Sequence, residues 1–152
     1  MSAVEMHTDG FRGALRDLYA GILNNAPQAL RAAVRAARDS AKSTKRFKDV
    51  TGWLRGSIRE DFDGPFKGRL RAGPKYARFV NDGTPPHEIS AKGGGVLHFQ
   101  MQGHDFFRRS VHHPGTKPRP FMDDAAAVGE QTLDYGLELM IERPIAHFNS
   151  GE

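Results

Sequence analysis

The feature that most constrains the fold is helical periodicity at both ends of the chain, around a middle that glycine and proline interrupt repeatedly. Near the C-terminal end, apolar and small residues recur at helical spacing between Met122 and Ile141. Pro120 suits the first turn of this helix, and we expect the helix to end before Pro144. These apolar and small residues form a stripe along one face of the helix. Its small members let another backbone approach closely, and such close packing offsets the low helix propensity of the glycines. They are Ala125, Ala126, Gly129 and Gly136.

Two further helices are expected near the N-terminal end. Apolar residues between Phe11 and Ile22 recur at three and four, as one face of a helix requires. Asn24-Asn25 followed by Pro27 is expected to end that helix, with Pro27 in the first turn of a second one. The second helix has a narrow apolar stripe, and its opposite face is basic. The stripe contains Leu30, Ala33, Val34, Ala37 and Ala41, and the basic face contains Arg31, Arg35, Arg38, Lys42 and Lys45.

The first half of the middle region predicts short elements separated by turns. Residues 51–58 have glycines in a single helical turn that leads into a strand. Residues 58–62 and 66–70 alternate around Asp63-Gly64-Pro65 and therefore predict a β-hairpin. Residues 74–82 predict a short helix that is closed by a left-handed glycine at Gly83.

The second half of the middle region is richer in proline. Residues 84–95 contain two prolines and three consecutive glycines, so we expect a mobile loop that becomes ordered against a neighbouring molecule. Residues 96–101 and 106–112 predict two strands, and residues 114–120 predict an extended connector.

Together these patterns predict an α+β fold with N-terminal helices, a small, mostly antiparallel sheet and a long C-terminal helix. We expect a single domain over residues 1–152. Within it we expect a helical region at 1–47, an α+β core at 48–142 and a tail at 143–152.

The residue types argue against an enzyme. The absence of cysteine excludes disulfides and thiolate chemistry. Gly56-Ser57-Ile58 lacks the second glycine of a serine-hydrolase turn, and the glycines at 93–95 lack the following Lys-Ser/Thr of a phosphate-binding loop. The histidines lack metal-site spacing, and adjacent strand residues point to opposite faces. The histidines considered are His87, His98, His104 and His112-His113. We expect no catalytic, cofactor or metal site.

Charge is distributed unevenly along the chain. Residues 1–60 carry 11 basic and 6 acidic residues, residues 61–122 carry 10 and 5, and residues 123–152 carry 1 and 7. A basic body with an acidic end can bind nucleic acid, or copies of itself head to tail. No apolar run approaches the ~18 residues of a membrane helix, and the first residues lack a signal-peptide pattern, so we expect no membrane contact.

Two rows of opposite charge occur on helices at opposite ends of the chain. Like charges four residues apart repel each other unless an opposite charge faces them. The rows can meet antiparallel within one chain or across a subunit boundary, and both arrangements remain open. The acidic row is Glu130, Asp134, Glu138 and Glu142, and the basic row is Arg31, Arg35, Arg38 and Lys42.

Three separated segments resemble head–tail joining and tail-component proteins of long-tailed lambdoid phages. They are Thr51-Gly-Trp-Leu-Arg-Gly-Ser-Ile58, Tyr76-Ala-Arg-Phe-Val-Asn-Asp-Gly-Thr84 and Ser110-Val-His-His-Pro-Gly-Thr-Lys-Pro-Arg-Pro-Phe-Met-Asp-Asp-Ala125. The second is similar to the family's Tyr-Ala-x-x-Val-Glu-x-Gly-Thr pattern, and the third contains its His-Pro-Gly and Pro-Phe. Asn81 stands where the family commonly has glutamate, and the glycines at 93–95 replace what is often a Pro-Lys segment.

The resemblance implies a structural virion protein that forms a ring, hexameric or dodecameric, in the phage neck, or that completes or terminates the tail tube. Such a protein is assembled in the host cytoplasm. Its partners are further copies and neighbouring neck or tail proteins, with non-specific DNA contact in the lumen. The alternative is a non-specific DNA-binding protein. Residues expected to shape the backbone, pack or lie between subunits are Arg31, Arg35, Arg38, Lys42, Tyr76, Phe79, Gly83, Thr84, Pro114, Gly115, Pro120, Phe121, Glu130, Asp134 and Glu138.

Overall fold

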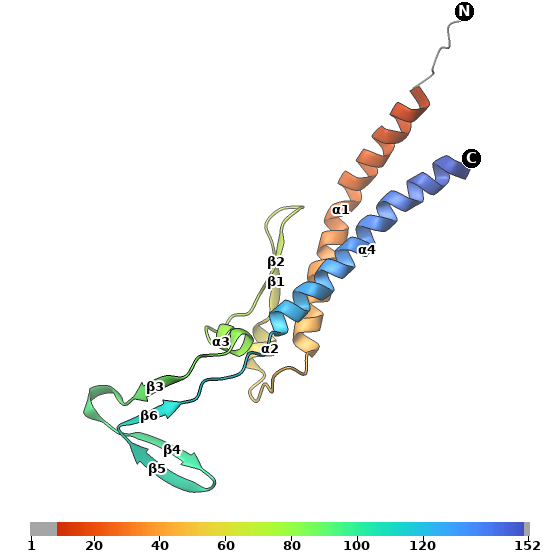
Figure 1. Ribbon diagram of the computed structural model, residues 1–152. Helices are drawn as coiled ribbons and strands as arrows, with labels where there is room; N and C mark the ends of the chain where they lie inside the picture. Colours follow the sequence, from red (N-terminus) through yellow and green to blue (C-terminus); the bar gives the residue numbers. More distant parts are fainter. Residues whose placement is uncertain (1–8, 151–152) are drawn as a thin grey trace, which may run out of the picture.

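The computed structural model describes residues 9–150 and has an α+β fold, as predicted. Helices α1 (Asp9–Ser43) and α4 (Phe121–Ser150) lie side by side, antiparallel, and form a long stalk (Figure 1). The short helices α2 (Trp53–Ser57) and α3 (Ala77–Asp82) lie at the base of the stalk. The first residues, which we expected to lack a signal peptide, lie outside the described range.

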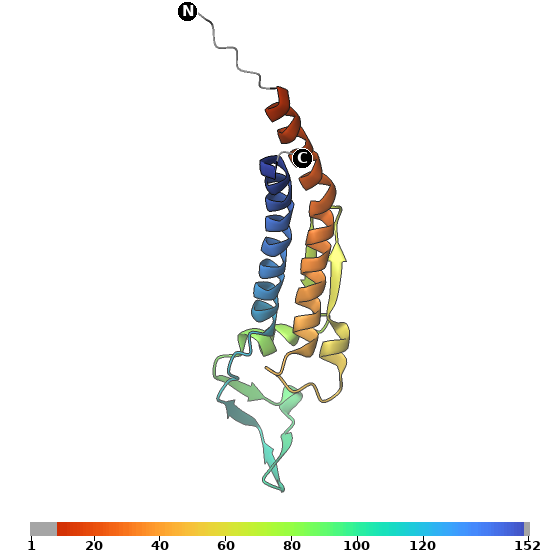
Figure 2. The ribbon, with the colours of Figure 1, turned by 90° about the vertical axis from the view of Figure 1, so that its right-hand side faces the viewer.

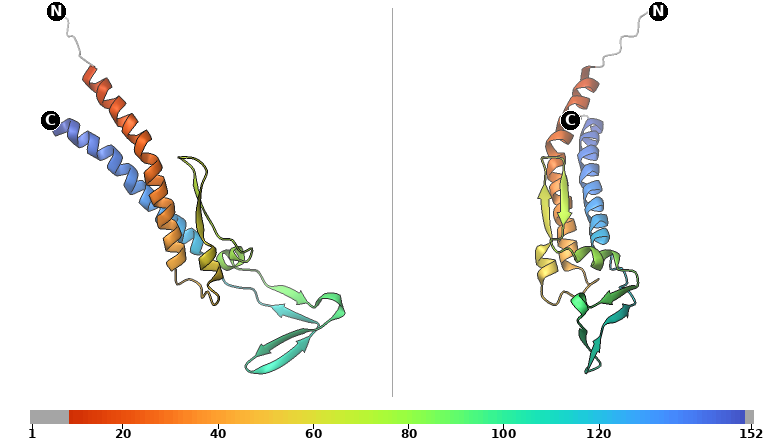
Figure 3. Two further views of the ribbon diagram at one scale, coloured as in Figure 1. Left: turned by 180° about the vertical axis from the view of Figure 1, so that it is seen from behind. Right: turned by 90° about the vertical axis from the view of Figure 1, so that its left-hand side faces the viewer.

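The strands form three separate antiparallel ribbons instead of the single small sheet that we expected. Strands β1 (Arg59–Phe62) and β2 (Gly68–Arg71) lie beside α1 (Figure 2). Strands β3 (His87–Ser90) and β6 (Ser110–His113) leave the base together, and β4 (Leu97–Met101) and β5 (His104–Arg108) continue beyond them. A single 3-10 turn, η1 (Lys92–Gly94), joins β3 to β4. We call residues 84–116 the arm (Figure 3).

The core lies where the stalk meets the base. Leu54 and Ile58 are buried there with the ring of Phe121, which meets Phe47 edge to face at 4.8 Å between centroids. A seam of buried alanines continues this core up the stalk between the two long helices. The buried alanines of α1 are Ala33, Ala37 and Ala41.

Small residues bring α1 and α4 close together, as the C-terminal pattern predicts. A Cβ atom added at Gly129 would lie 3.2 Å from the Cβ of Ala37, and one at Gly136 would lie 3.1 Å from the Cβ of Ala29. Both contacts are tighter than ordinary van der Waals packing. Ala126, which we placed in the buried stripe, is exposed.

The predicted break between two N-terminal helices is wrong, because α1 runs without interruption through Pro27. Proline removes one backbone hydrogen bond and costs a helix about 3 kcal/mol. Close packing of Ala29, Ala33 and Ala37 against α4, just beyond the proline, offsets this cost. The Asn25 side chain also donates a hydrogen bond to the Gly21 carbonyl (2.8 Å).

The predicted end of the last helix is also wrong, since α4 continues past Pro144 to Ser150. Residues 143–150 therefore belong to a helix and do not form the predicted tail, whose last two residues lie outside the described range. A proline read from the local sequence alone predicts a helix end too readily when tertiary packing against another helix stabilises the long helix.

The arm differs most from its prediction. Residues 87–90, expected to lie in a mobile loop, form β3 because β6 supplies a pairing partner. Residues 106–112 are the end of β5 and most of β6, with a break at Arg109. The turn between β4 and β5 is Gln102-Gly103, both with positive φ (55° and 81°), which is the two-residue turn that suits a hairpin.

The other short elements occur where the sequence predicts them. Helix α2, the β1–β2 hairpin and α3 are confirmed, and residues 114–120 form an extended connector. Gly83 follows α3 with φ of 74°, as expected, but its ψ of −172° is extended, so it redirects the chain and does not close the helix with a left-handed turn.

Candidate assembly surfaces

The three segments that carry the resemblance meet at the base of the stalk. The first supplies Leu54 and Ile58 to the core, the second supplies Ala77, and the third supplies Phe121 and Ala125. These side chains are apolar and buried, so their role is to hold the stalk, the short helices and the arm together. Pro120 opens α4 by accepting a hydrogen bond from the Asp124 amide (3.1 Å).

Arg55 ties the first segment to the end of α1, a role that the sequence analysis did not detect. Its guanidinium donates hydrogen bonds to the carbonyl oxygens of Lys42, Thr44 (2.6 Å) and Phe47 (3.1 Å). It also lies 4.6 Å above the ring of Phe47. A cation at the C-terminal end of a helix satisfies free carbonyls and complements the helix dipole.

Asn81 stands where the family that the three segments resemble commonly has glutamate. Its side-chain oxygen accepts a hydrogen bond from the Met122 amide (2.9 Å), and its side-chain nitrogen donates to Asp123 (3.0 Å). Asn81 therefore satisfies a free amide in the first turn of α4 without an ion pair. The sequence signal that could have suggested this contact is Asp123, an acidic residue in the first turn of α4.

The arm joins the base at a crossing of two chain segments. The Thr84 and Thr116 amides each donate to the other residue's carbonyl oxygen at 3.0 Å. Gly83 and Gly115 precede these threonines with φ of 74° and 85°, which confirms their predicted unusual dihedrals. A Cβ at Gly115 would lie 2.3 Å from the Thr84 carbonyl oxygen, and one at Gly83 would lie 2.4 Å from that of Thr116. Only glycine fits at either position.

Beyond this crossing, the arm extends away from the rest of the molecule (Figure 3). Every residue of β3 is exposed, and so are the large side chains of Val96 (59%), Met101 (56%) and Phe107 (57%). Isolated two-stranded ribbons are marginally stable in water. An arm with this composition is suited to burial against another protein surface.

Two aromatic residues expected to pack within the subunit are instead exposed. Tyr76 is 43% exposed and Phe79 is 53% exposed, so neither packs in the core of the subunit, and a position between subunits stays a prediction for both. They belong to a six-residue helix and its cap, which is too short to bury more than one face, and Ala77 occupies that face. Phe121 is 1% exposed, as predicted. Pro114 is exposed in the connector that follows β6 and leads back to the base.

The basic row lies on the side of α1 that faces away from α4. Ala33 faces α4, and at 100° per residue Arg31, Arg35, Arg38 and Lys42 lie about 140° to 180° around the helix from it. We call this side of the stalk, together with the β1–β2 hairpin that packs on it, the basic edge. Arg31 stacks 4.7 Å above the Phe62 ring of the hairpin.

Part of the basic edge is neutralised within the chain. Arg38 binds Asp39 (2.8 Å) and Glu60 (2.6 Å), and these contacts hold the pKa of both carboxyl groups below their usual values. On the hairpin, Asp61 pairs with Arg69 and Arg71, and Asp63 pairs with Lys67. Arg35, Lys42 and Arg59 are exposed and have no ion-pair partner within 4.0 Å among the described side chains.

The acidic row lies on the opposite side of the stalk. Gly129 faces α1, and Glu130, Asp134 and Glu138 lie about 100°, 140° and 180° around α4 from it. All four residues of the row are exposed, and no ion pair joins them to any side chain that the structure describes. We call this side the acidic edge. The two rows therefore do not meet within the chain.

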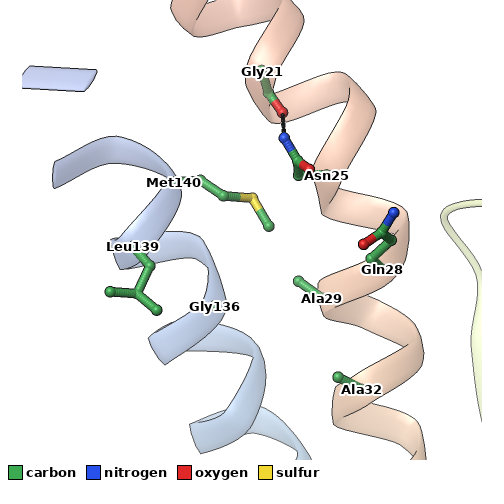
Figure 4. Close-up of a pocket in the computed structure, with 8 residues that line it drawn as sticks. All are labelled: Gly21, Asn25, Gln28, Ala29, Ala32, Gly136, Leu139 and Met140. Carbon is green, nitrogen blue, oxygen red and sulfur yellow. Dashed lines mark hydrogen bonds between the residues drawn. The ribbon is translucent and has the colours of Figure 1, made fainter. Parts of the chain in front are cut away.

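A hollow of about 550 Å³ opens between the two long helices above their closest contact. Small and flexible side chains line it, with Met140 of α4 extending toward α1 and Asn25 bound to Gly21 on the other side (Figure 4). Without a buried charged or polar group aimed into it, this hollow offers no binding chemistry of its own.

Two histidines of the arm bind carboxylates, and two others lie ring beside ring, in each case across a ribbon. His98 contacts Asp105 (2.8 Å), His112 contacts Glu88 (2.9 Å), and the rings of His87 and His113 are 5.1 Å apart. His112 and His113 point to opposite faces, as expected. Within residues 9–150, no three His, Cys, Asp or Glu side chains converge as metal ligands would.

Among the described residues, no helix is both long and apolar enough to cross a membrane. Comparison with protein-family models, curated proteins and solved structures finds no match to this chain.

Proposed function

We propose that this chain is a structural subunit of a tailed-phage virion that assembles into a ring in the neck or at the end of the tail tube. Two lines of reasoning support the proposal. One is the resemblance of the three segments that meet at the base, and the other is the amount of surface that a single subunit leaves exposed.

The exposed surface is the observation that carries the proposal. The chain exposes 11837 Å², whereas a compact monomer of 16.8 kDa exposes about 7,700 Å². The ten residues outside the described range would account for about 1,600 Å² even if fully extended. The remaining excess of about 2,500 Å² exceeds two standard interface faces of about 800 Å² each. A ring subunit presents two such faces, one to each neighbour.

Light scattering coupled to size-exclusion chromatography tests the proposal. Over a range of protein concentrations we expect one closed oligomer, hexameric or dodecameric if the resemblance holds, and ring-shaped particles by negative-stain electron microscopy. A chain that stays monomeric at every concentration and salt level overturns the proposal.

A second candidate function is non-specific DNA binding, and the basic edge is the observation that favours it. The structure brings Arg31, Arg35 and Lys42 of α1 to the same side as Lys67, Arg69 and Arg71 of β2 and its turn. Clustered cations of this kind neutralise backbone phosphates. The ion pairs to Asp61 and Asp63 weaken the case, since they already occupy part of the edge.

A salt titration of DNA affinity separates the two functions. Binding by a persistent monomer that falls steeply between 50 and 200 mM salt would support the DNA-binding function. A ring that binds DNA weakly, or only through its lumen, supports the proposed function as a virion subunit.

A further inference from the structure

We infer that the acidic edge of one subunit docks on the basic edge of the next, so that copies of this chain associate head to tail. The inference rests on the proposed ring and specifies its interface. The occupant of each edge is a second copy of the same chain.

The charges of the two edges are complementary. Every charged residue of α4 between residues 121 and 142 is acidic, because this stretch contains no basic residue. The basic edge carries eight basic residues against four acidic ones. They are Arg31, Arg35, Arg38, Lys42, Arg59, Lys67, Arg69 and Arg71 against Asp39, Glu60, Asp61 and Asp63. Like charges spaced four residues apart repel each other along α4, and a facing row of arginine and lysine removes that repulsion.

The position of the edges decides the type of association. The acidic edge lies on the side of α4 away from α1, and the basic edge lies on the side of α1 away from α4, so a third copy can always be added to a pair. Surfaces of opposite charge on opposite sides of a subunit produce heterologous contacts, which close into a ring when the rotation between copies allows it. A two-fold dimer would place like charges against each other.

The α1–α4 contacts also fix which charges share a level along the stalk. Gly129 lies between Ala33 and Ala37, and Gly136 lies against Ala29. Because both helices rise equally per residue, Glu130 is level with Arg35 and Asp134 is level with Arg31, within one residue. In a flat ring, neighbouring copies stand at the same height, so Arg35 meets Glu130 of the next copy. Each exposed pair is weak, but a row of them sets register and orientation.

Reciprocal charge reversal tests this pairing. Arg35→Glu and Glu130→Arg should each weaken assembly about tenfold, measured as the dissociation constant by sedimentation velocity at low salt. The double variant should return to within about threefold of the original chain. Arg78→Glu is the matched control, because Arg78 is exposed on α3 and the change in charge is the same. It should assemble normally.

Each outcome decides between alternatives. If the original chain assembles but both single variants assemble equally well, or the double variant assembles no better than the singles, the interface is wrong while the proposed ring stands. If the original chain is always monomeric, the proposed ring itself fails. If Arg35→Glu lowers DNA affinity and leaves assembly unchanged, the basic edge binds a polyanion and the inference is overturned.

Folding of the variants is checked by circular dichroism. Arg35 lies near the hairpin, so Arg35→Glu has a structural risk that Glu130→Arg does not share. If Arg35→Glu fails to fold, Glu130→Arg alone still decides, because normal assembly of that variant contradicts the pairing.

Discussion

Gly115→Ala should open the crossing that joins the arm to the base. Gly115 has φ of 85°, and an added Cβ would lie 2.3 Å from the Thr84 carbonyl oxygen. The left-handed conformation costs an alanine about 1–2 kcal/mol. The clash also separates Thr84 from Thr116 and removes two backbone hydrogen bonds of about 0.5–1.5 kcal/mol each. The total destabilisation of the crossing is about 2–5 kcal/mol.

Gly103→Ala is the matched control. Gly103 has φ of 81° in the β4–β5 turn, but an added Cβ would have no neighbour within 4 Å. The substitution Gly103→Ala therefore destabilises the turn by about 1–2 kcal/mol, from backbone strain alone. The difference between the variants, about 1–3 kcal/mol, corresponds to about a 5- to 150-fold difference in opening.

Amide hydrogen exchange at Thr84 and Thr116 measures this opening directly, with both variants compared in the same assembly state. We expect both amides to exchange at least fivefold faster in Gly115→Ala than in Gly103→Ala. Equal exchange in the two variants would refute the reasoning, because the crossing would then not depend on the close approach at Gly115.

Three further predictions concern the stalk. Gly129→Leu should lower the free energy of unfolding in urea by about 1–3 kcal/mol, since the new side chain meets Ala37, and unchanged stability would contradict the close packing. Phe121→Ala should lower it by about 3–5 kcal/mol, and a loss below 1 kcal/mol would contradict the 1% exposure of the ring. Arg38 lowers the pKa of Glu60, so the stability from this pair is complete above about pH 4.3 and is lost as the pH falls through the lowered value. Glu60→Gln should reduce the acid dependence of the urea midpoint, and an unchanged dependence would contradict this assignment.

The assembly surfaces were only partly accessible to sequence reasoning. The charge rows could be read from the spacing along each helix, because that spacing is a local property. Whether the rows meet within the chain depends on how the two helices are rotated about their axes. The contacts of Gly129 and Gly136 with the alanines of α1 set that rotation, and they turn both rows outward.

The aromatic residues show the same limit. Tyr76, Phe79 and Phe121 are all large aromatic residues of the kind found in protein cores, yet only Phe121 is buried. Burial depends on which elements surround a side chain, and α3 has a neighbour on one face only. Arg55 and Asn81 were not assigned structural roles because the groups they bind lie elsewhere in the sequence.

The sequence by itself determined the α+β class, the small residues that bring α1 and α4 together, and the glycines at 83 and 115. All of these follow from local periodicity or from the dihedral preferences of single residues. Tertiary structure alone decided that α1 passes through Pro27, that residues 87–90 form a strand, and that the strands divide into three ribbons. Each of these outcomes depends on a partner distant in sequence, which offsets a local penalty or supplies a missing hydrogen bond, and local patterns contain no information on that partner.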